Sequence, residues 1–254
     1  MNGFFITGTD TEIGKTFVTA ALTRALAASG LRVAPIKSLA AGQQFVDGRW
    51  VNEDVATLLA AQNLGLTDTD VGPLQFREPC APHIAAKLEG RTIDRDALLT
   101  AIRAAAAKAD IALVEGVGGF RVPLTLPPPG RLKEADTPSG GESRPRDSGG
   151  QQSGWDTADL AVDLGLPVVL VVGLRLGCIN HALLTAEAIR ARGLRLAAWV
   201  ANTADPHQPH VADNLASLQA GLKAPCLGHI PRLTDPLAAP ACLDISALLS
   251  EERA

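Results

Sequence analysis

The chain has 254 residues, of which 46% are hydrophobic and 20% charged, and this suits one large α/β domain, with two small domains as the alternative. A net charge of −4 without a Lys/Arg tract, and aromatic residues at 4% with no Tyr, argue against nucleic acid or an anionic membrane as a partner. The four cysteines are scattered, so we expect neither structural zinc nor disulfides. The N-terminus does not resemble a signal peptide and the apolar runs are short, so we expect a cytoplasmic protein.

Short apolar runs alternate with helical patterns along the chain. The predicted elements, in chain order, are a strand over 3–9, a helix over 14–30, a strand over 32–38, a helix beginning within 52–62, a helix over 92–109 and strands over 110–116, 167–173 and 194–202. The last three strands are continuous Val/Ile/Leu-rich runs, which are typical of parallel sheets covered on both faces. We therefore predict a single α/β domain over 1–254, with a doubly wound, mostly parallel sheet of the P-loop NTPase type. Its ligand site should lie beyond the carboxyl ends of the strands.

One stretch breaks this alternation. Residues 126–154 are dense in Pro, Gly, Ser and charged side chains and contain almost nothing apolar to bury. Because the alternating pattern continues on both sides, we predict a disordered insertion within the domain and not a linker between domains.

The sequence "GTDTEIGKT", residues 8–16, lies between the first predicted strand and the first helix. A phosphate-binding loop has four residues between its glycines, whereas five separate Gly8 from Gly14. The segment is therefore either a phosphate loop with a shifted first glycine or a tight turn. The strand–loop–helix context favours the first, with Lys15 reaching terminal phosphates and the Thr16 hydroxyl ligating magnesium.

Magnesium at such loops also needs carboxylates from elsewhere in the fold. Glu115 ends an apolar strand and is followed by "GVGG", which lets backbone approach a ligand. Asp54 opens a helix, where it is a magnesium ligand or an ordinary acid of the first helical turn. Lys37 closes the second strand, where it stabilises charge on a transferring phosphoryl group or is a surface lysine.

Several segments together resemble the dethiobiotin synthetase family. They are "GTDTEIGKT", "IKSLAAG", "EPCAPHIAAKLEGR", "VEGVGG", "LGLPVVLVVGLRLGCINHALLTAEAI", "AAWVANTADP" and "LGHIPRL". The resemblance covers nearly the whole chain except the insertion and the last residues, and the family's loop carries the same extra residue. It implies closure of the ureido ring of diaminopelargonate with carbon dioxide, driven by ATP and Mg²⁺ through a carbamate and a carbamic–phosphoric mixed anhydride.

The resemblance also implies roles for individual residues. Lys15 and Lys37 would be catalytic, and Thr16, Asp54 and Glu115 would hold magnesium. The implied ATP-binding residues are Glu12, Ile13, Gly14, Lys15, Thr16, Phe17, Asp54, Glu115, Gly116, Val117, Gly118, Asn202, Thr203, Pro231, Arg232 and Leu233. Asn202 among these would read the adenine edge. The implied substrate-binding residues are Thr11, Lys37, Ala41, Gly177, Cys178, Ile179 and Asn180. The last four would come from the partner subunit of a homodimer and bind the substrate's distant carboxylate.

The active lysine of the family is usually followed by Pro-x-x-Ser-Gly, whereas here Lys37 is followed by Ser38-Leu39-Ala40-Ala41-Gly42. Ala41 lacks the family's hydroxyl, and Ser38 is a candidate to replace it. The rival interpretation is a partitioning-type ATPase switch that acts through protein partners. Those proteins carry a signature lysine in a K-G-G loop, where this chain has Thr9-Asp10-Thr11.

Overall fold

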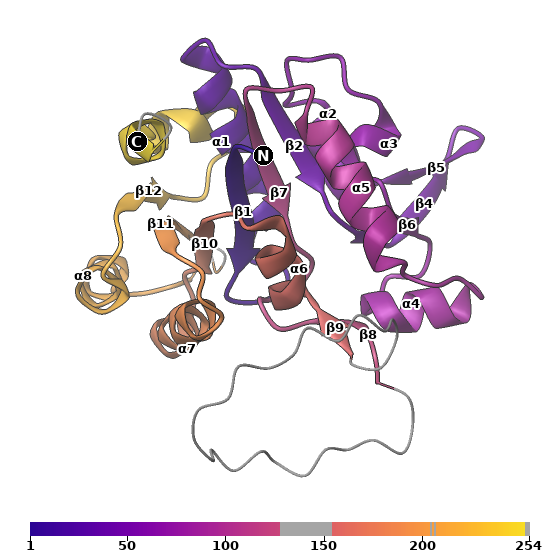
Figure 1. Ribbon diagram of the computed structural model, residues 1–254. Coiled ribbons are helices and arrows are strands. Elements are labelled where there is room, and N and C mark those ends of the chain that lie inside the picture. The colour runs from indigo at the N-terminus through magenta and orange to yellow at the C-terminus, as the bar shows by residue number, and fades with distance from the viewer. Residues whose placement is uncertain (128–153, 204, 206, 252–254) are drawn as a thin grey trace.

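The computed structural model describes residues 1–127, 154–203, 205 and 207–251. Residues 128–153, which make up nearly all of the predicted insertion, lie outside the described residues. At the centre is a six-stranded sheet in which every neighbouring pair is parallel (Figure 1). Its strands, in spatial order, are β12 (Cys226–Ile230), β11 (Leu196–Asn202), β10 (Val168–Gly173), β1 (Gly3–Gly8), β7 (Ile111–Glu115) and β2 (Val33–Lys37). This confirms the predicted α/β class and parallel sheet; β12 was not predicted.

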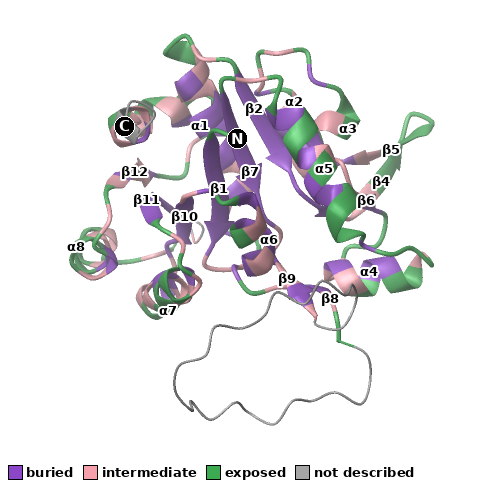
Figure 2. Cartoon of the chain, viewed as in Figure 1, coloured by how far each residue is buried: buried purple, intermediate pink, exposed green. Residues whose placement is uncertain are grey.

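Helices cover both faces of the sheet. They are α1 (Lys15–Ala28), α2 (Glu53–Leu59), α3 (Asp68–Val71), α4 (Pro82–Leu88), α5 (Arg95–Ala106), α6 (Thr157–Leu164), α7 (Cys178–Ala191), α8 (Val211–Leu222), the 3₁₀ helix η1 (Pro236–Cys242) and α9 (Ser246–Glu251). Figure 2 shows the inner strands of this sheet buried and the outer helix faces exposed. The sheet is therefore doubly wound, as predicted.

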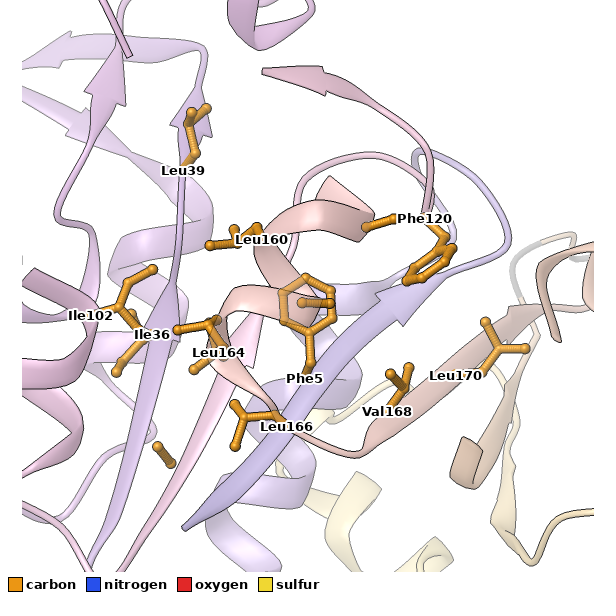
Figure 3. Packing of buried hydrophobic residues seen from close by; sticks show 14 of the residues in the cluster. Phe5, Ile36, Leu39, Ile102, Phe120, Leu160, Leu164, Leu166, Val168 and Leu170 are labelled. Carbon is orange, nitrogen blue, oxygen red and sulfur yellow. The ribbon is translucent and has the colours of Figure 1, made fainter. Parts of the chain in front are cut away.

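Successive residues of each central strand point to opposite faces, and this sorts the core into two clusters. Phe4 and Ile6 of β1 pack with α1, η1 and α9. Phe5 belongs to the cluster on the other face, which includes residues of α5 and α6. Figure 3 shows Leu160 and Leu164 near the Phe5 ring and Ile102 beside Ile36. Because both faces are covered, the strands are continuously apolar, which explains why the sequence pattern identified them.

Three two-stranded sheets lie outside the central one. They are β3 (Ala40–Ala41) with β6 (Gln75–Phe76), the hairpin β4 (Gln43–Val46) with β5 (Arg49–Asn52), and β8 (Pro123–Thr125) with β9 (Trp155–Asp156). The hairpin was not predicted, although Asp47 and Gly48 at its turn are a hairpin signature and both have positive φ, at 49° and 80°. Within the described ranges, the helices are too short or too polar to cross a membrane.

Replacing Phe5 by Ala should lower the free energy of unfolding by about 3–5 kcal/mol, because a fully buried ring is lost from a packed face. Urea denaturation followed by circular dichroism measures this loss. Phe45→Ala is the matched control, since that ring is 63% exposed on the hairpin and its removal should cost no more than about 1 kcal/mol. Equal losses in the two variants would contradict the assignment of Phe5 to the core.

Candidate functional site

The loop between β1 and α1 accommodates its extra residue with left-handed backbone. Glu12 has φ 57° and Gly14 has φ 81°, and a non-glycine residue at positive φ is uncommon. Ile13 between them is buried against Gly8 and Gly173, where a Cβ at either glycine would lie within 3.0 Å of the Ile13 side chain. The five-residue spacing is thus a defined conformation, pinned by one apolar side chain.

Lys15 opens α1 and folds back over the loop. Its Nζ donates to the carbonyl oxygen of Asp10 at 2.7 Å. Burial lowers the pKa of Lys15 to about 8, while the charge of Glu115 acts in the opposite direction. The Asp10 side chain pairs with Arg175, which lies beyond β10. Sequence reasoning missed Asp10 and Arg175, and only the spatial neighbourhood of β1 and β10 brings them together.

Four predicted residues converge beside the loop. Lys37 and Glu115 end adjacent strands and stand opposite each other in register. Lys37 Nζ lies 2.7 Å from Glu115 Oε1 and 2.6 Å from Asp54 Oδ2. The Thr16 hydroxyl donates to Glu115 Oε1 at 2.8 Å. Residues from β2, β7, α1 and α2 thus form one cluster, which we call the carboxylate cluster: Thr16, Lys37, Asp54 and Glu115.

The charges in this cluster depend on one another. Lys37 is 4% exposed; burial by itself would lower its pKa, but Glu115 and then Asp54 outweigh burial and hold the pKa above its ordinary value. Burial would likewise raise the pKa of Asp54, but Lys37, with smaller contributions from Thr16 and Lys15, outweighs burial and holds this pKa below its ordinary value. Lys37 and Asp54 are therefore both charged at neutral pH.

Asp54 reaches the cluster because the hairpin returns the chain to Asn52. The Asn52 side chain accepts from the Val55 N–H and so caps α2, and its amide donates to the carbonyl oxygens of Ala41 and Gly42. Asn52 was not predicted as a site residue, although an Asn followed by Glu and Asp is a recognisable helix start. It holds the first turn of α2 against the segment that follows β2.

The cluster fits a magnesium ion. Glu115 Oε2 is buried and, within the described part of the chain, has no hydrogen-bond partner. Thr16 Oγ1 and Glu115 Oε1 are 2.8 Å apart, and neighbouring ligands of an octahedral magnesium ion are about 2.9 Å apart when each metal–oxygen distance is about 2.0–2.1 Å. Oxygen donors of this kind suit a hard cation. The residues predicted to hold magnesium are therefore brought together.

A cavity of about 250 Å³ lies on the other side of the loop. It is lined by Glu12, Ile13, Gly14, Phe17, Asn202, Thr203, Pro231, Arg232 and Leu233. All nine belong to the predicted ATP-binding set. Asn202 at the end of β11 donates its amide to the Ile13 carbonyl oxygen at 2.8 Å, so one N–H of this amide holds the loop.

Thr203 shares a hydrogen bond of 2.8 Å with His229 Nε2. Burial lowers the pKa of His229, which keeps the imidazole neutral at neutral pH. Sequence reasoning missed His229, which lies in β12 directly before the Pro231–Leu233 segment.

Two further predicted segments lie after β7 and at the start of α7. Gly116, Val117 and Gly118 follow β7, and a Cβ at Gly118 would lie 3.6 Å from Thr11 Oγ1, so this turn faces the phosphate loop. Gly177 to Asn180 begin α7; in the described chain no hydrogen bond joins them to the phosphate loop or to the carboxylate cluster. The partner-subunit role of these four stays a prediction.

The suggestion that Ser38 replaces the missing family hydroxyl is wrong. Ser38 is fully buried, and its hydroxyl donates to the Glu115 carbonyl oxygen at 2.8 Å. The Lys37 side chain points toward Asp54 and Glu115, and the next residue of an extended chain points the other way. Ala41 is half-buried, with its carbonyl oxygen occupied by Asn52.

A second cavity, of about 490 Å³, lies between the hairpin and α4. It is lined by Gln43, Trp50, Arg77, Glu78, Leu88, Glu89 and Arg91. It contains no residue of the phosphate loop or of the carboxylate cluster, so it is separate from the site described above.

Comparison with known proteins places the chain in a family. A family model described as AAA domain, AAA_26, matches residues 2–126 and 151–239. The chain belongs to the AAA_26 family. Its phosphate loop, its carboxylate cluster and the cavity beside Asn202 are thus features of an AAA_26 member, and the family supports P-loop nucleotide binding.

Solved structures with a similar fold include MinD cell-division proteins and a ParA family ATPase. MinD from Pyrococcus furiosus is 15% identical with a TM-score of 0.49, and each chain is covered in full. A ParA family ATPase from Chlorobium tepidum TLS is 15% identical with a TM-score of 0.48, covering 100% of this chain and 95% of that one. MinD from Aquifex aeolicus is 15% identical with a TM-score of 0.47, covering 99% and 90%. Likeness at this level does not extend to activity.

Replacing Glu115 by Gln should lower the free energy of unfolding by about 3–5 kcal/mol, because the buried Lys37 ammonium keeps only Asp54 as a carboxylate partner. Urea denaturation measures the effect. Arg32→Ala breaks the exposed pair with Asp110 and should cost far less than the Glu115 substitution, because water screens exposed charges. If both variants unfold at the same urea concentration, the buried pair does not have the stabilising role we assign to it.

Proposed function

We propose that this AAA_26 member is an ATP- and Mg²⁺-dependent dethiobiotin synthetase. The observation that carries the proposal is the Lys37 ammonium at the carboxyl end of β2, beside the phosphate loop and among Thr16, Asp54 and Glu115. A lysine there provides a positive charge for an acidic group on a second substrate as well as for the nucleotide's terminal phosphate. The family to which the chain belongs includes dethiobiotin synthetase.

The proposed reaction has three steps. One amine of diaminopelargonate adds to carbon dioxide and loses a proton, giving a carbamate. A carbamate oxygen attacks the γ-phosphorus of ATP and ADP leaves, giving the mixed anhydride. The second amine then attacks the carbamoyl carbon, phosphate leaves, and loss of a proton completes the ureido ring. Positioning and neutralisation of charge account for most of the catalysis in phosphoryl transfer.

This chain's own residues have defined tasks in the proposal. Lys15 neutralises the terminal phosphates, and Lys37 binds the carbamate oxygens beside the γ-phosphate. Thr16, Asp54 and Glu115 hold magnesium, which when bound offsets the charge that develops on the phosphate oxygens. Unpaired N–H groups at the start of α1 add to this field, because a helix N-terminus favours anions.

The cavity beside Asn202 supports adenine as the base. One amide N–H of Asn202 is engaged by Ile13, which leaves the second N–H and the amide oxygen for a ligand. Adenine presents an acceptor at N7 and a donor at N6, the pattern that an amide matches with two hydrogen bonds. Guanine presents two acceptors along the same edge, so the amide oxygen would face an acceptor.

We further propose a homodimer in which Gly177 to Asn180 of each subunit serve the other subunit's site. Gly177 has a left-handed backbone at the start of the 14-residue helix α7. The Cys178 N–H donates to the Arg175 carbonyl oxygen, and the N–H groups of the next residues in this first turn suit a carboxylate. The substrate's distant carboxylate would bind at this helix end while its amines lie near Lys37.

The alternative is a partitioning-type ATPase switch acting through protein partners. The two functions differ in what controls phosphate release: a small diamine for the synthetase, a macromolecular partner for the switch. Thr9, Asp10 and Thr11 occupy the stretch where such switches carry their signature lysine, and this favours the synthetase.

Purified protein with ATP, Mg²⁺, bicarbonate and diaminopelargonate should yield dethiobiotin and phosphate in equal amounts. The measurement is mass spectrometry of the product alongside a phosphate assay. Phosphate release that does not depend on the diamine would contradict the proposed synthetase activity.

Lys15→Ala should abolish turnover while the circular dichroism spectrum is unchanged, and retained activity would refute the role given to Lys15.

Asn202→Ala should weaken ATP binding by about 10- to 100-fold, since a two-bond contact to a base is worth about 1–3 kcal/mol. Isothermal titration with ATP and with inorganic triphosphate separates two effects. Loss of the hydrogen bond to Ile13 weakens both ligands equally, whereas loss of base recognition weakens ATP alone. Equal weakening of both ligands would show that Asn202 does not read adenine.

A further inference from the structure

The Lys37 ammonium occupies the centre of the carboxylate cluster. Its Nζ is 2.6 Å from Asp54 Oδ2, 2.7 Å from Glu115 Oε1 and 3.4 Å from Thr16 Oγ1. These oxygens belong to the same three residues that are proposed to hold magnesium. A divalent cation that contacted these same three oxygens would have to lie close to the position of the lysine nitrogen.

We infer that Lys37 and a divalent cation exclude one another from these oxygens, so that binding of the cation releases the Lys37 ammonium from its two carboxylate partners. The inference rests on the proposed magnesium role of Thr16, Asp54 and Glu115. A magnesium ion bound at about 2.0–2.1 Å from these oxygens would overlap the ammonium and repel its charge. The two cations cannot share the position.

The unpaired oxygen of Glu115 supports this exchange independently. A lysine ammonium has three N–H donors, and the oxygens within 3.4 Å of Lys37 Nζ come one each from Asp54, Glu115 and Thr16. Glu115 Oε2 is left buried without a partner among the described residues. Pairing with Lys37 thus leaves the buried oxygen Glu115 Oε2 without a hydrogen bond, and a doubly charged cation would stabilise this oxygen.

The exchange gives an order to the events at the site. Before the divalent cation arrives, Lys37 is 4% exposed and paired with two carboxylates, so it is withheld from an anionic substrate. When the cation arrives with the nucleotide phosphates, the freed ammonium can bind an oxyanion such as a carbamate. Lys37 would then meet the acidic substrate group only after the divalent cation and the nucleotide are in place.

Binding of Mn²⁺ alone, without nucleotide, tests the exclusion. Electron paramagnetic resonance of free Mn²⁺ should show that Lys37→Gln lowers the dissociation constant by about tenfold or more relative to the unaltered protein. Lys15→Gln is the matched control, because it removes the same charge from a neighbouring lysine whose Nζ is bonded to the Asp10 carbonyl instead. Its effect should not exceed about threefold. No change in Lys37→Gln, or equal changes in both variants, would overturn the inference.

A second measurement uses the unaltered protein and so does not depend on the folding of a variant. Trace labelling with acetic anhydride, followed by mass spectrometry, reports the reactivity of each lysine amine. Added Mg²⁺ should increase labelling of Lys37 several-fold, while exposed Lys87 serves as a constant reference. A Lys37 rate that stays constant or falls would overturn the inference. Neither measurement uses the diamine or ATP, so a failed synthetase assay leaves both results interpretable.

Discussion

One buried carboxylate, Glu115, joins most parts of the site. Its side chain accepts from Lys37 and Thr16, and its main-chain carbonyl accepts from both the N–H and the hydroxyl of Ser38. The end of β2, the end of β7 and the first turn of α1 are thereby tied together. A fully buried carboxylate persists only when it is paired. The hydrogen bonds and ion pair that offset the cost of burying Glu115 also bring together Thr16 and Lys37, which are proposed to bind magnesium and substrate.

A parallel sheet makes this assembly possible. Because β1, β2, β7 and β11 all run in one direction, their carboxyl ends meet at one edge. The phosphate loop leaves β1 there, pinned by Ile13 against Gly8 and Gly173 and held by the Asn202 amide at the end of β11. The cavity beside Asn202 and the carboxylate cluster lie on either side of this loop. The proposed base, phosphates and second substrate therefore share one rigid frame.

Sequence patterns identified the central strands well because those strands are apolar on both sides. The β4–β5 hairpin was missed because it has no buried face: Phe45 and Trp50 are largely exposed, so no alternation marks its strands. The Asp47–Gly48 pair was the available signal. The suggestion that Ser38 replaces the family hydroxyl failed for a geometric reason. Neighbouring residues of an extended chain point to opposite sides, and Lys37 already faces Asp54 and Glu115.

Local periodicity and spacing are enough to identify the parallel α/β class, the loop that ends in Gly14-Lys15-Thr16, and the strand ends that carry Lys37 and Glu115. The position of Lys37 among three oxygen ligands and the hydrogen bond from Asn202 to the loop follow from the folded arrangement alone. Those contacts join residues 78 and 189 positions apart. They depend on the order of strands in the sheet, and local patterns do not specify which strands become neighbours.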